Sequence, residues 1–434
     1  MVYVLSKNEY KQVTDYIAEN RDQLVRLTQD LVKVPSVSGH ENEVQQLIHS
    51  ILDEMDIDPQ FCLPDIEVLR NHPDFFETTS FVKHGYEDRP NVIADIKGAG
   101  GGRSLCLSGH IDVVSPEPLR KWNYDPWGGD VEENVLYGRG AGDMKGGVAC
   151  IIFAVKALRS LGIKLRGDLQ LETTIEEEDG GVGGVLYLRT VRPKTDAALI
   201  PEPSALTISL ASAGVMYFRV KLLGVPAHAA TAHFGVNAAQ KAVPIIEALE
   251  DLHKSRQERI SYPTAEHDPR MKGRVTTINL GVVRAGDWPS TVPALCELEY
   301  RIGWPPGETR EEVMQQVEET VADAARADDW LSENPPEIEW FGWKSRPHEL
   351  SKDDSFVQTV RENVSRVTDS EPSYIGGSSG LDTRYFVHNG TPAVTCGPYA
   401  ERIHSYDESV SIDSLVKTAQ VIAGVMMDWC GVGE

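Results

Sequence analysis

Four acidic residues stand side by side in the stretch LQLETTIEEEDGGVGG, residues 169–184, where an alternating apolar pattern gives way to glycines. They are Glu176, Glu177, Glu178 and Asp179. Their carboxylates repel one another, and no Lys or Arg lies nearby in the sequence to relieve the repulsion. A strand that ends in such a run indicates a site for cations, because bound cations would offset the surplus negative charge.

Other residues of metal-ligating type also follow apolar segments. They are His110 and Asp112 in LCLSGHIDVV, Asp143 in YGRGAGDMKGG, Glu202 in IPEPSAL and His404 in RIHSYDES. In a parallel sheet the carboxyl ends of the strands share one rim, so we expect these side chains to meet there. Nitrogen and oxygen donors without thiolate favour zinc, with manganese or cobalt as alternatives.

The elements that must position these residues alternate between strands and helices. Strand patterns cover residues 91–96, 104–110 and 168–175, and the glycine-led apolar run 146–162 is typical of a buried helix. Strands alternating with helices predict an α/β fold with a largely parallel central sheet.

A different order of elements occupies residues 213–343. Its strand, helix, two strands, helix and strand match the β-α-β-β-α-β order of a ferredoxin-like unit. We therefore predict a catalytic, metal-binding domain formed by residues 1–212 and 344–434, interrupted by an inserted domain of residues 213–343.

Composition narrows the class of protein. A chain of 434 residues with 41% apolar residues predicts about two domains, and its formal charge of −24 argues against nucleic acid or anionic membrane as a partner. Without a signal-peptide pattern or an apolar run of about 18 residues, we expect a cytoplasmic protein. Six dispersed cysteines with no C-x-x-C pair favour reduced thiols over disulfides or a thiolate zinc site.

Taken as a set, the motifs resemble the M20 co-catalytic metallopeptidases. This family includes acetylornithine deacetylase, succinyl-diaminopimelate desuccinylase, the aminoacylases and the glutamate carboxypeptidases. The resemblance rests on G-H-x-D, G-x-x-D-M-K-G-G, a double glutamate before x-G-G-V-G, E-P and a late I-H-S-x-x-E, and it extends to SVSGHENEV near the N-terminus. It implies a zinc-peptidase-like catalytic domain and an inserted ferredoxin-like lid or dimerisation domain.

The resemblance also implies two divalent metal ions per chain. Asp143 would bridge the two ions. Glu202 would join His110 on one ion, and Glu178 would join His404 on the other.

The same resemblance assigns the chemistry around the ions. Asp112 would hydrogen-bond the far nitrogen of His110 and fix its tautomer. Glu177 would be the general base, Glu176 would take a position where the family often has Asp, and Asp179 would only face solvent.

In the inserted domain, the resemblance points to three residues. His228, in GVPAHAATAHFGV, would reach the oxyanion, in dimeric members from the neighbouring subunit, so we expect a homodimer formed through this domain. Arg301 would grip a substrate carboxylate as a bidentate fork, although Glu299 on the same strand face could instead hold it in a salt bridge. Ser290 stands where the family often has Asn.

Two further segments match the family more loosely. The glycine-rich loop GGSSGLDTR would place Gly380, Asp382 and Arg384 beside the substrate. Residues 64–91, which precede the first core strand, are longer than in the shortest members and resemble the broader deacylase-like branch.

The sequence thus predicts an amidohydrolase that removes an acyl group from a small-molecule N-acyl amino acid or related amine. A dipeptidase or carboxypeptidase would use the same metals, and so would a formamide-cleaving or aryl-amine-releasing relative. A binding protein that kept the fold without catalysis is the alternative from another class.

Overall fold

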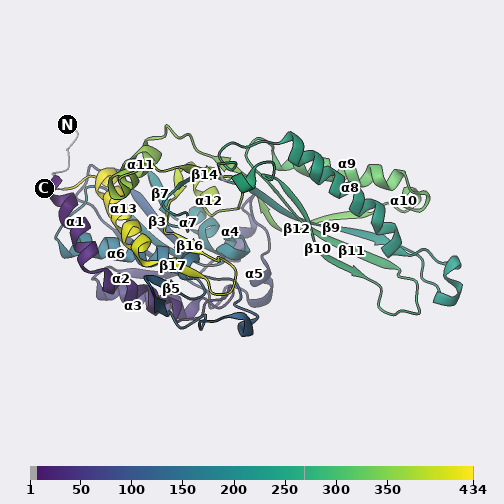
Figure 1. The fold of residues 1–434 in the computed structure, drawn as a ribbon, viewed down its shortest axis with the longest axis horizontal. Coiled ribbons are helices and arrows are strands. Elements are labelled where there is room, and N and C mark those ends of the chain that lie inside the picture. Colours follow the sequence, from purple (N-terminus) through teal and green to yellow (C-terminus); the bar gives the residue numbers. More distant parts are fainter. Residues whose placement is uncertain (1–6, 268, 434) are drawn as a thin grey trace. The chain divides into compact units, whose positions relative to one another are not determined.

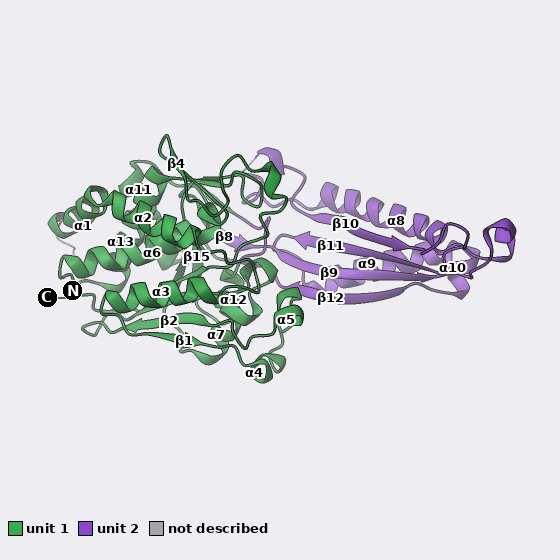
Figure 2. Ribbon diagram, turned by 90° about the horizontal axis from the view of Figure 1, so that it is seen from below, with its two compact units in different colours: residues 1–210, 350–375, 382–434 green, residues 211–349, 376–381 purple. Residues whose placement is uncertain are grey.

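The fold is described by a computed structural model that covers residues 7–267 and 269–433 (Figure 1). It consists of two compact units (Figure 2). None of the helices within these residues is long and apolar enough to cross a bilayer.

The first unit is built on a sheet whose centre is parallel. In spatial order its strands are β1 (Pro59–Cys62), β2 (Asn91–Ile96), β6 (Leu169–Thr174), β3 (Leu105–His110), β7 (Ala197–Ile200), β15 (Ala393–Thr395) and β8 (Ile208–Ser212). Neighbours from β6 to β15 run parallel, whereas β1, β2 and β8 join antiparallel, and β14 (Tyr374–Gly376) also pairs with β8. The predicted α/β class with a mostly parallel central sheet is confirmed.

Every residue of β3 and β6 is buried, as expected for parallel strands that lie inside an α/β layer structure. The helices of this unit are α1 (Lys7–Glu19), α2 (Arg21–Val32), α3 (Asn42–Glu54), α4 (Ile66–Arg70), α5 (Thr79–His84), α6 (Gly146–Ser160), α7 (Tyr187–Val191), α11 (Ser355–Thr368), α12 (Thr383–His388) and α13 (Ile412–Cys430). Helices α6 and α13 are the most deeply embedded of the long helices, with 12 of 15 and 14 of 19 residues buried.

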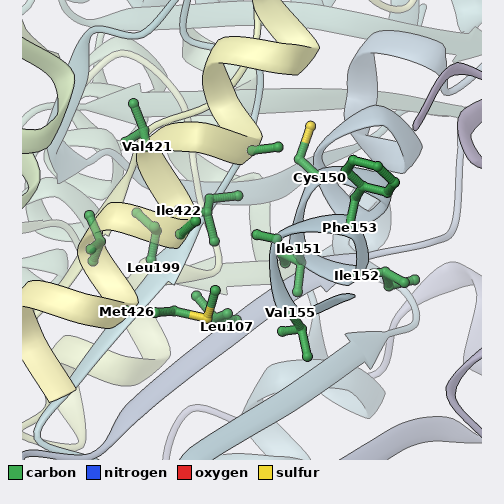
Figure 3. Packing of buried hydrophobic residues seen from close by; sticks show 14 of the residues in the cluster. Leu107, Cys150, Ile151, Ile152, Phe153, Val155, Leu199, Val421, Ile422 and Met426 are labelled. Carbon is green, nitrogen blue, oxygen red and sulfur yellow. The ribbon is translucent and has the colours of Figure 1, made fainter. Parts of the chain in front are cut away.

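The core of the first unit joins these two helices to the central strands. Figure 3 shows Leu107 of β3 and Leu199 of β7 in one cluster with side chains of α6 and α13. Burying this apolar surface holds the strands in register, at about 25 cal/mol per Å². The rim beyond the strands therefore rests on a rigid support.

A small four-stranded sheet brings two distant loops together within the first unit. Its order is β16 (Ala400–Glu401), β17 (Ser409–Ser411), β5 (Val135–Tyr137) and β4 (Val131–Glu132). The antiparallel pair Ser409 and Tyr137 sets the loop that contains His404 beside the turn that leads to Asp143.

The second unit is an antiparallel sheet with helices on it. The strands follow the order β10 (Thr277–Ala285), β11 (Leu295–Trp304), β9 (Gly214–Leu223) and β12 (Glu337–Ser345), and the helices are α8 (Ala238–Arg259), α9 (Arg310–Arg326) and the short α10 (Asp329–Glu333). Alternate residues of β9, including Phe218 and Val220, share one buried apolar cluster with Val313 and Val317 of α9. The predicted ferredoxin-like order is confirmed.

The boundaries between the units differ from the predicted ones. The second unit comprises residues 211–349 and also residues 376–381, whereas the sequence placed 211–212, 344–349 and 376–381 in the catalytic domain. Strand β13 (His348–Glu349) pairs with Ala211 and Ser212, and the amide of Gly377 donates to the carbonyl of Ala211. A prediction that followed chain order could not anticipate this returning segment.

Candidate metal centre

The strand ends of the first unit converge on one rim. His110 is the last residue of β3, the pair Glu177 and Glu178 lies in the turn after β6, and Glu202 follows β7. These three strands are neighbours in the sheet. Asp143 comes from the turn that precedes α6.

One carboxylate stands between two imidazoles. Asp143 Oδ1 lies 3.0 Å from Nε2 of His110, and its Oδ2 lies 3.3 Å from Nε2 of His404. The two oxygens of a single side chain thus face two separate nitrogen donors. This is the arrangement that a carboxylate bridging two cations requires.

Each imidazole also faces a carboxylate of its own. Glu202 Oε1 is 3.4 Å from Nε2 of His110, and Glu178 Oε2 is 2.9 Å from Nε2 of His404. Both sets offer only nitrogen and oxygen, which suits Zn²⁺, Mn²⁺ or Co²⁺ better than a soft, thiolate-seeking ion. The donor chemistry of the residues therefore fits two divalent cations.

Glu177 lies within the same cluster but has different surroundings. One of its oxygens lies within 4.8 Å of ligand atoms of both His110 and Glu202. Its side chain is buried, and none of the described residues donates a hydrogen bond to its carboxylate. A carboxylate without a donor of its own is available for proton transfer.

Asp112 holds the acidic turn in place. Its Oδ1 accepts from the amide of Glu177 at 3.0 Å, and its Oδ2 accepts from the amide of Glu178 at 3.3 Å and from Ser38 Oγ at 2.7 Å. His110 Nδ1 lies 2.9 Å from the main-chain carbonyl of Asp112 but 3.6 Å from its carboxylate. The sequence predicted that the carboxylate of Asp112 would bond to Nδ1 of His110, but the main-chain carbonyl of Asp112 is the nearer partner. This contact at Nδ1 leaves Nε2 free to bind a cation.

The electrostatics reflect crowded negative charge. Burial raises the pKa of Glu202 to about 8, against the opposing attraction of His110, and burial followed by repulsion from Asp143 raises the pKa of Glu178 to about 7. Hydrogen bonds to Asp143 and Glu178 raise the pKa of His404 to about 10. Without cations the cluster therefore keeps protons that a bound metal would displace.

The acidic run divides between two environments. Asp179, predicted only to face solvent, is half-buried and its Oδ2 accepts from the amide of Ser80 at 2.6 Å. Glu176 is fully buried and likewise points away from the cluster, toward residues 78–89. Only the middle pair, Glu177 and Glu178, faces the candidate ligands.

Sequence reasoning missed a buried pair that anchors Asp143. Glu408 Oε1 accepts from the amides of Gly142 at 3.1 Å and Asp143 at 3.0 Å, and its Oε2 pairs with Arg139. Arg139 Nη2 also donates to the carbonyl of Ser405, next to His404, at 3.2 Å. The signal was present, since Glu408 is the last residue of the I-H-S-x-x-E motif.

Two residues of the glycine-rich loop form a buried ion pair, with Arg384 Nη2 3.7 Å from Asp382 Oδ1. Arg384 is 1% exposed and donates through Nη2 to the carbonyl of Gly180 at 2.7 Å, and burial raises the pKa of Asp382 to about 6. Gly380 belongs to the second unit, where a Cβ would come within 2.9 Å of Trp343. Direct contact of these residues with a substrate stays a prediction.

The other predicted residues lie in the second unit. His228 is exposed and its Nδ1 accepts from the amide of Ala230, while the carbonyl of exposed Ser290 accepts from Ala229. Glu299, the alternative partner of Arg301, instead pairs with Arg219 at 2.9 Å and Arg284 at 2.7 Å.

Arg301 itself is half-buried and contacts only Thr277 Oγ1, at 3.4 Å, among the polar groups of the described residues. Its guanidinium therefore has no carboxylate partner within that part of the chain. The structure leaves it able to receive an anionic group.

A two-unit fold whose parallel sheet carries imidazoles and carboxylates on one rim is typical of metal-dependent hydrolases. Comparison with known protein families supports the same class. The model of Peptidase family M20/M25/M40 matches residues 106–428, so the chain belongs to this family. The prediction of an M20-type amidohydrolase is confirmed at this level.

Relatives of known name extend over nearly the whole chain. It is 26% identical over 442 residues, 97% of both chains, to N-formyl-4-amino-5-aminomethyl-2-methylpyrimidine deformylase of Halalkalibacterium halodurans. The deformylase of the same name from Bacillus subtilis is 29% identical over 366 residues, 80% of this chain and 84% of the relative. Succinyl-diaminopimelate desuccinylase of Methylobacterium radiotolerans is 28% identical over 416 residues, 93% and 96% of the two chains.

Solved structures share the fold. A dipeptidase of Saccharomyces cerevisiae aligns with a TM-score of 0.75 at 14% identity over 98% of this chain and 99% of the other. A tripeptidase of Staphylococcus aureus aligns with a TM-score of 0.71 at 20% identity over 94% and 98%.

Proposed function

We propose that the chain is a dinuclear metal-dependent amidohydrolase that removes a small acyl group from the nitrogen of an amine. The observation that carries the proposal is the position of Asp143 between His110 and His404, with a further carboxylate for each imidazole. A carboxylate shared in this way would hold two cations close enough together to act on one amide.

The roles of the residues follow from their surroundings. His110, Asp143 and Glu202 would hold one cation, and Asp143, Glu178 and His404 the other. Once bound, the cations would lower the pKa of a water molecule and polarise the scissile carbonyl.

Glu177 would act as the general base. It would take a proton from the attacking water and return it to the departing nitrogen as the carbon–nitrogen bond breaks, giving a carboxylic acid and a free amine. Its burial supports this role, because burial, followed by the charge of Asp382, raises the pKa of Glu177 well above its usual range. A carboxylate with a raised pKa is the stronger base.

The names of the relatives guide the choice of substrate. Two deformylases of a formamide-bearing aminomethylpyrimidine and one desuccinylase are matched over 80% or more of this chain. All three names describe removal of an acyl group from an amine, so deacylation is favoured over cleavage between two amino acids.

Arg301 supports a substrate that carries a carboxylate. Because Glu299 is occupied by Arg219 and Arg284, the Arg301 guanidinium remains available for a bidentate contact. An N-acyl amino acid would provide that partner, whereas the formamide named for the two deformylases would not.

The second unit is proposed to mediate a homodimer and to supply His228. Strand β10 lies at the edge of its sheet, paired on one side with β11, and an edge strand can pair with a second chain. The exposed imidazole of His228, with Nδ1 already accepting from Ala230, could donate through Nε2 to an oxyanion.

A metal analysis and a substrate panel test the proposal. The protein, loaded with Zn²⁺, Mn²⁺ or Co²⁺, would be assayed with the formyl aminomethylpyrimidine, N-succinyl and N-acetyl amino acids, and dipeptides, with Glu177→Ala as the matched inactive control. Release of free amine from an N-acyl substrate supports deacylation. Faster hydrolysis of dipeptides would make the enzyme a peptidase of the same family, and no hydrolysis by fully loaded protein would refute the proposal.

A further inference from the structure

A second buried network lies directly behind the acidic turn. It consists of Glu176 and the residues that surround its side chain, and we call it the Glu176 clamp: Glu41, Thr78, Ser80, Tyr86, Arg89 and Glu176. All six residues are at most 6% exposed. Four of them, Thr78, Ser80, Tyr86 and Arg89, come from the segment of residues 64–91 that precedes the first core strand.

Both oxygens of Glu176 are fully used in the clamp. Oε1 accepts from Thr78 Oγ1 at 2.6 Å, from Ser80 Oγ at 2.7 Å and from Arg89 Nη1 at 3.2 Å. Oε2 accepts from Tyr86 Oη at 2.8 Å and from the amide of Gly183 at 2.8 Å. A buried carboxylate with five donors is held in one orientation.

Arg89 connects the clamp to the rest of the unit. Its guanidinium makes a two-pronged contact with Glu41, through Nη2 to Oε1 at 2.7 Å and Nε to Oε2 at 2.8 Å. Glu41 also accepts from the amide of Gly39 at 2.8 Å. Because Arg89 balances charge on both acids, neither Glu41 nor Glu176 is a lone buried charge.

The backbone at Glu176 explains why a clamp is needed. Its φ of 69° lies in the left-handed region, which costs an ordinary residue about 1 to 2 kcal/mol. The very next residue is Glu177, and Asp112 holds the amides of Glu177 and Glu178 from the other side. The turn is therefore fixed from two sides, by the side chain of Glu176 and by that of Asp112.

We propose that Tyr86 and Arg89 are positioning residues that act through Glu176 to hold Glu177 in place for proton transfer. The inference rests on the proposed role of Glu177 as the general base. Neither Tyr86 nor Arg89 bonds to a candidate metal ligand, so their loss displaces the base without removing a donor.

Two substitutions release the clamp. Tyr86→Phe removes one donor to Glu176 while keeping the ring, whose centroid lies 4.7 Å from that of Phe81. Arg89→Met removes the guanidinium from both acids. We expect kcat to fall about 10-fold for Tyr86→Phe and about 100-fold for Arg89→Met, because small displacements of a catalytic group cost up to about that factor. KM and the number of bound metal ions should remain unchanged.

The chain offers a matched control on the same strand. Glu172 lies on β6, the strand that leads into the acidic turn, four residues before Glu176. It is a buried acid whose carboxylate forms ion pairs with Arg189 and Arg192, outside the turn. Glu172→Gln should lower the melting temperature while kcat stays within about two-fold. If kcat fell as much in Glu172→Gln as in the clamp variants, the proposal would be overturned, because a general loss of stability would then explain both results.

Hydrogen exchange of residues 174–184 gives a readout independent of activity. Faster exchange there in Tyr86→Phe and Arg89→Met, but not in Glu172→Gln, is expected. If folded Tyr86→Phe showed unchanged exchange and unchanged kcat, the proposed role of the clamp would be wrong. It would also be wrong if the clamp variants lost bound metal while kcat per bound metal stayed the same. If the wild-type chain hydrolysed no amide, the proposed function would fail, whereas the exchange comparison would still decide whether the clamp holds the turn.

Discussion

The main-chain amide of Asp143 donates a hydrogen bond of 3.0 Å to Oε1 of Glu408, 265 residues further along the chain. The candidate bridging ligand is thus oriented by an acid that is not itself among the candidate ligands. Since Arg139 links Glu408 to the loop of His404, one buried pair sets the positions of two candidate ligands.

Glu408→Gln should weaken metal binding by about 10- to 100-fold, the usual cost of losing a group that orients a ligand. The neutral amide would hold Arg139 less firmly and free the turn at Asp143. Competition with a metal-binding dye would measure the affinity. Glu172→Gln, which also removes a charge from a buried pair with Arg, should bind metal normally.

Asp143→Ala should abolish binding of both ions, because each imidazole shares this carboxylate. Elemental analysis after dialysis would give the stoichiometry. Glu178→Ala, by comparison, should lose only the ion on the side of His404. Two ions retained by the Asp143 variant would eliminate the bridge.

Glu177→Ala should keep its metal ions yet lose about 10²- to 10⁴-fold in kcat, the range that general acid–base catalysis contributes. Initial rates and elemental analysis on the same preparation would separate the two effects. If Glu177→Ala lost an ion and Glu178→Ala kept both, the register of the two roles would be wrong by one residue.

Metal binding should release protons and strengthen as the pH rises. In the metal-free cluster the pKa values of Glu178, Glu202 and His404 are raised to about 7, 8 and 10, so at pH 7 His404 and Glu202 are mostly protonated and Glu178 about half so. Ligation requires removal of these protons, and apparent affinity should therefore fall as pH falls through 10 and further through 8 and 7. Titration calorimetry in buffers of different ionisation enthalpy counts the protons, and a count of zero at pH 7 would contradict the assignment.

Arg301→Ala should reduce kcat/KM about 10- to 150-fold for an N-acyl amino acid, the equivalent of about 1.5 to 3 kcal/mol for a charged hydrogen bond. The matching N-acyl amine without a carboxylate should be hydrolysed as before. An equal loss on both substrates would argue against a carboxylate clamp and favour the formamide named for the two deformylases.

Motifs at strand ends predicted which residues would gather, because parallel strands deliver their carboxyl ends to a single rim. The mostly parallel central sheet and the ferredoxin-like unit followed equally from the alternation of patterns. The sequence pattern could not predict which way each side chain of the acidic run points. Glu176 and Asp179 point away from the candidate metal ligands, whereas Glu177 and Glu178 point toward them. Apart from the amide of Gly183, the partners of Glu176 and Asp179 lie about 90 positions or more away, so no local spacing encodes them.

Ser38 and Glu41 illustrate the same limit. Both stand in the SVSGHENEV motif that supported the family resemblance, yet no role could be read from their types. Only the folded chain shows Ser38 donating to Asp112 and Glu41 pairing with Arg89.

The first unit is assembled from three separate stretches of chain, and this affects the order in which a ribosome can deliver it. Strand β7 waits for β15, nearly two hundred residues later, and His404 emerges after every other candidate ligand. Residues 211–349, by contrast, emerge without interruption and can begin to fold while the central sheet is incomplete. A nascent chain paused before residue 404 would expose the acidic turn without its last imidazole, and cations should bind it weakly until synthesis is almost finished.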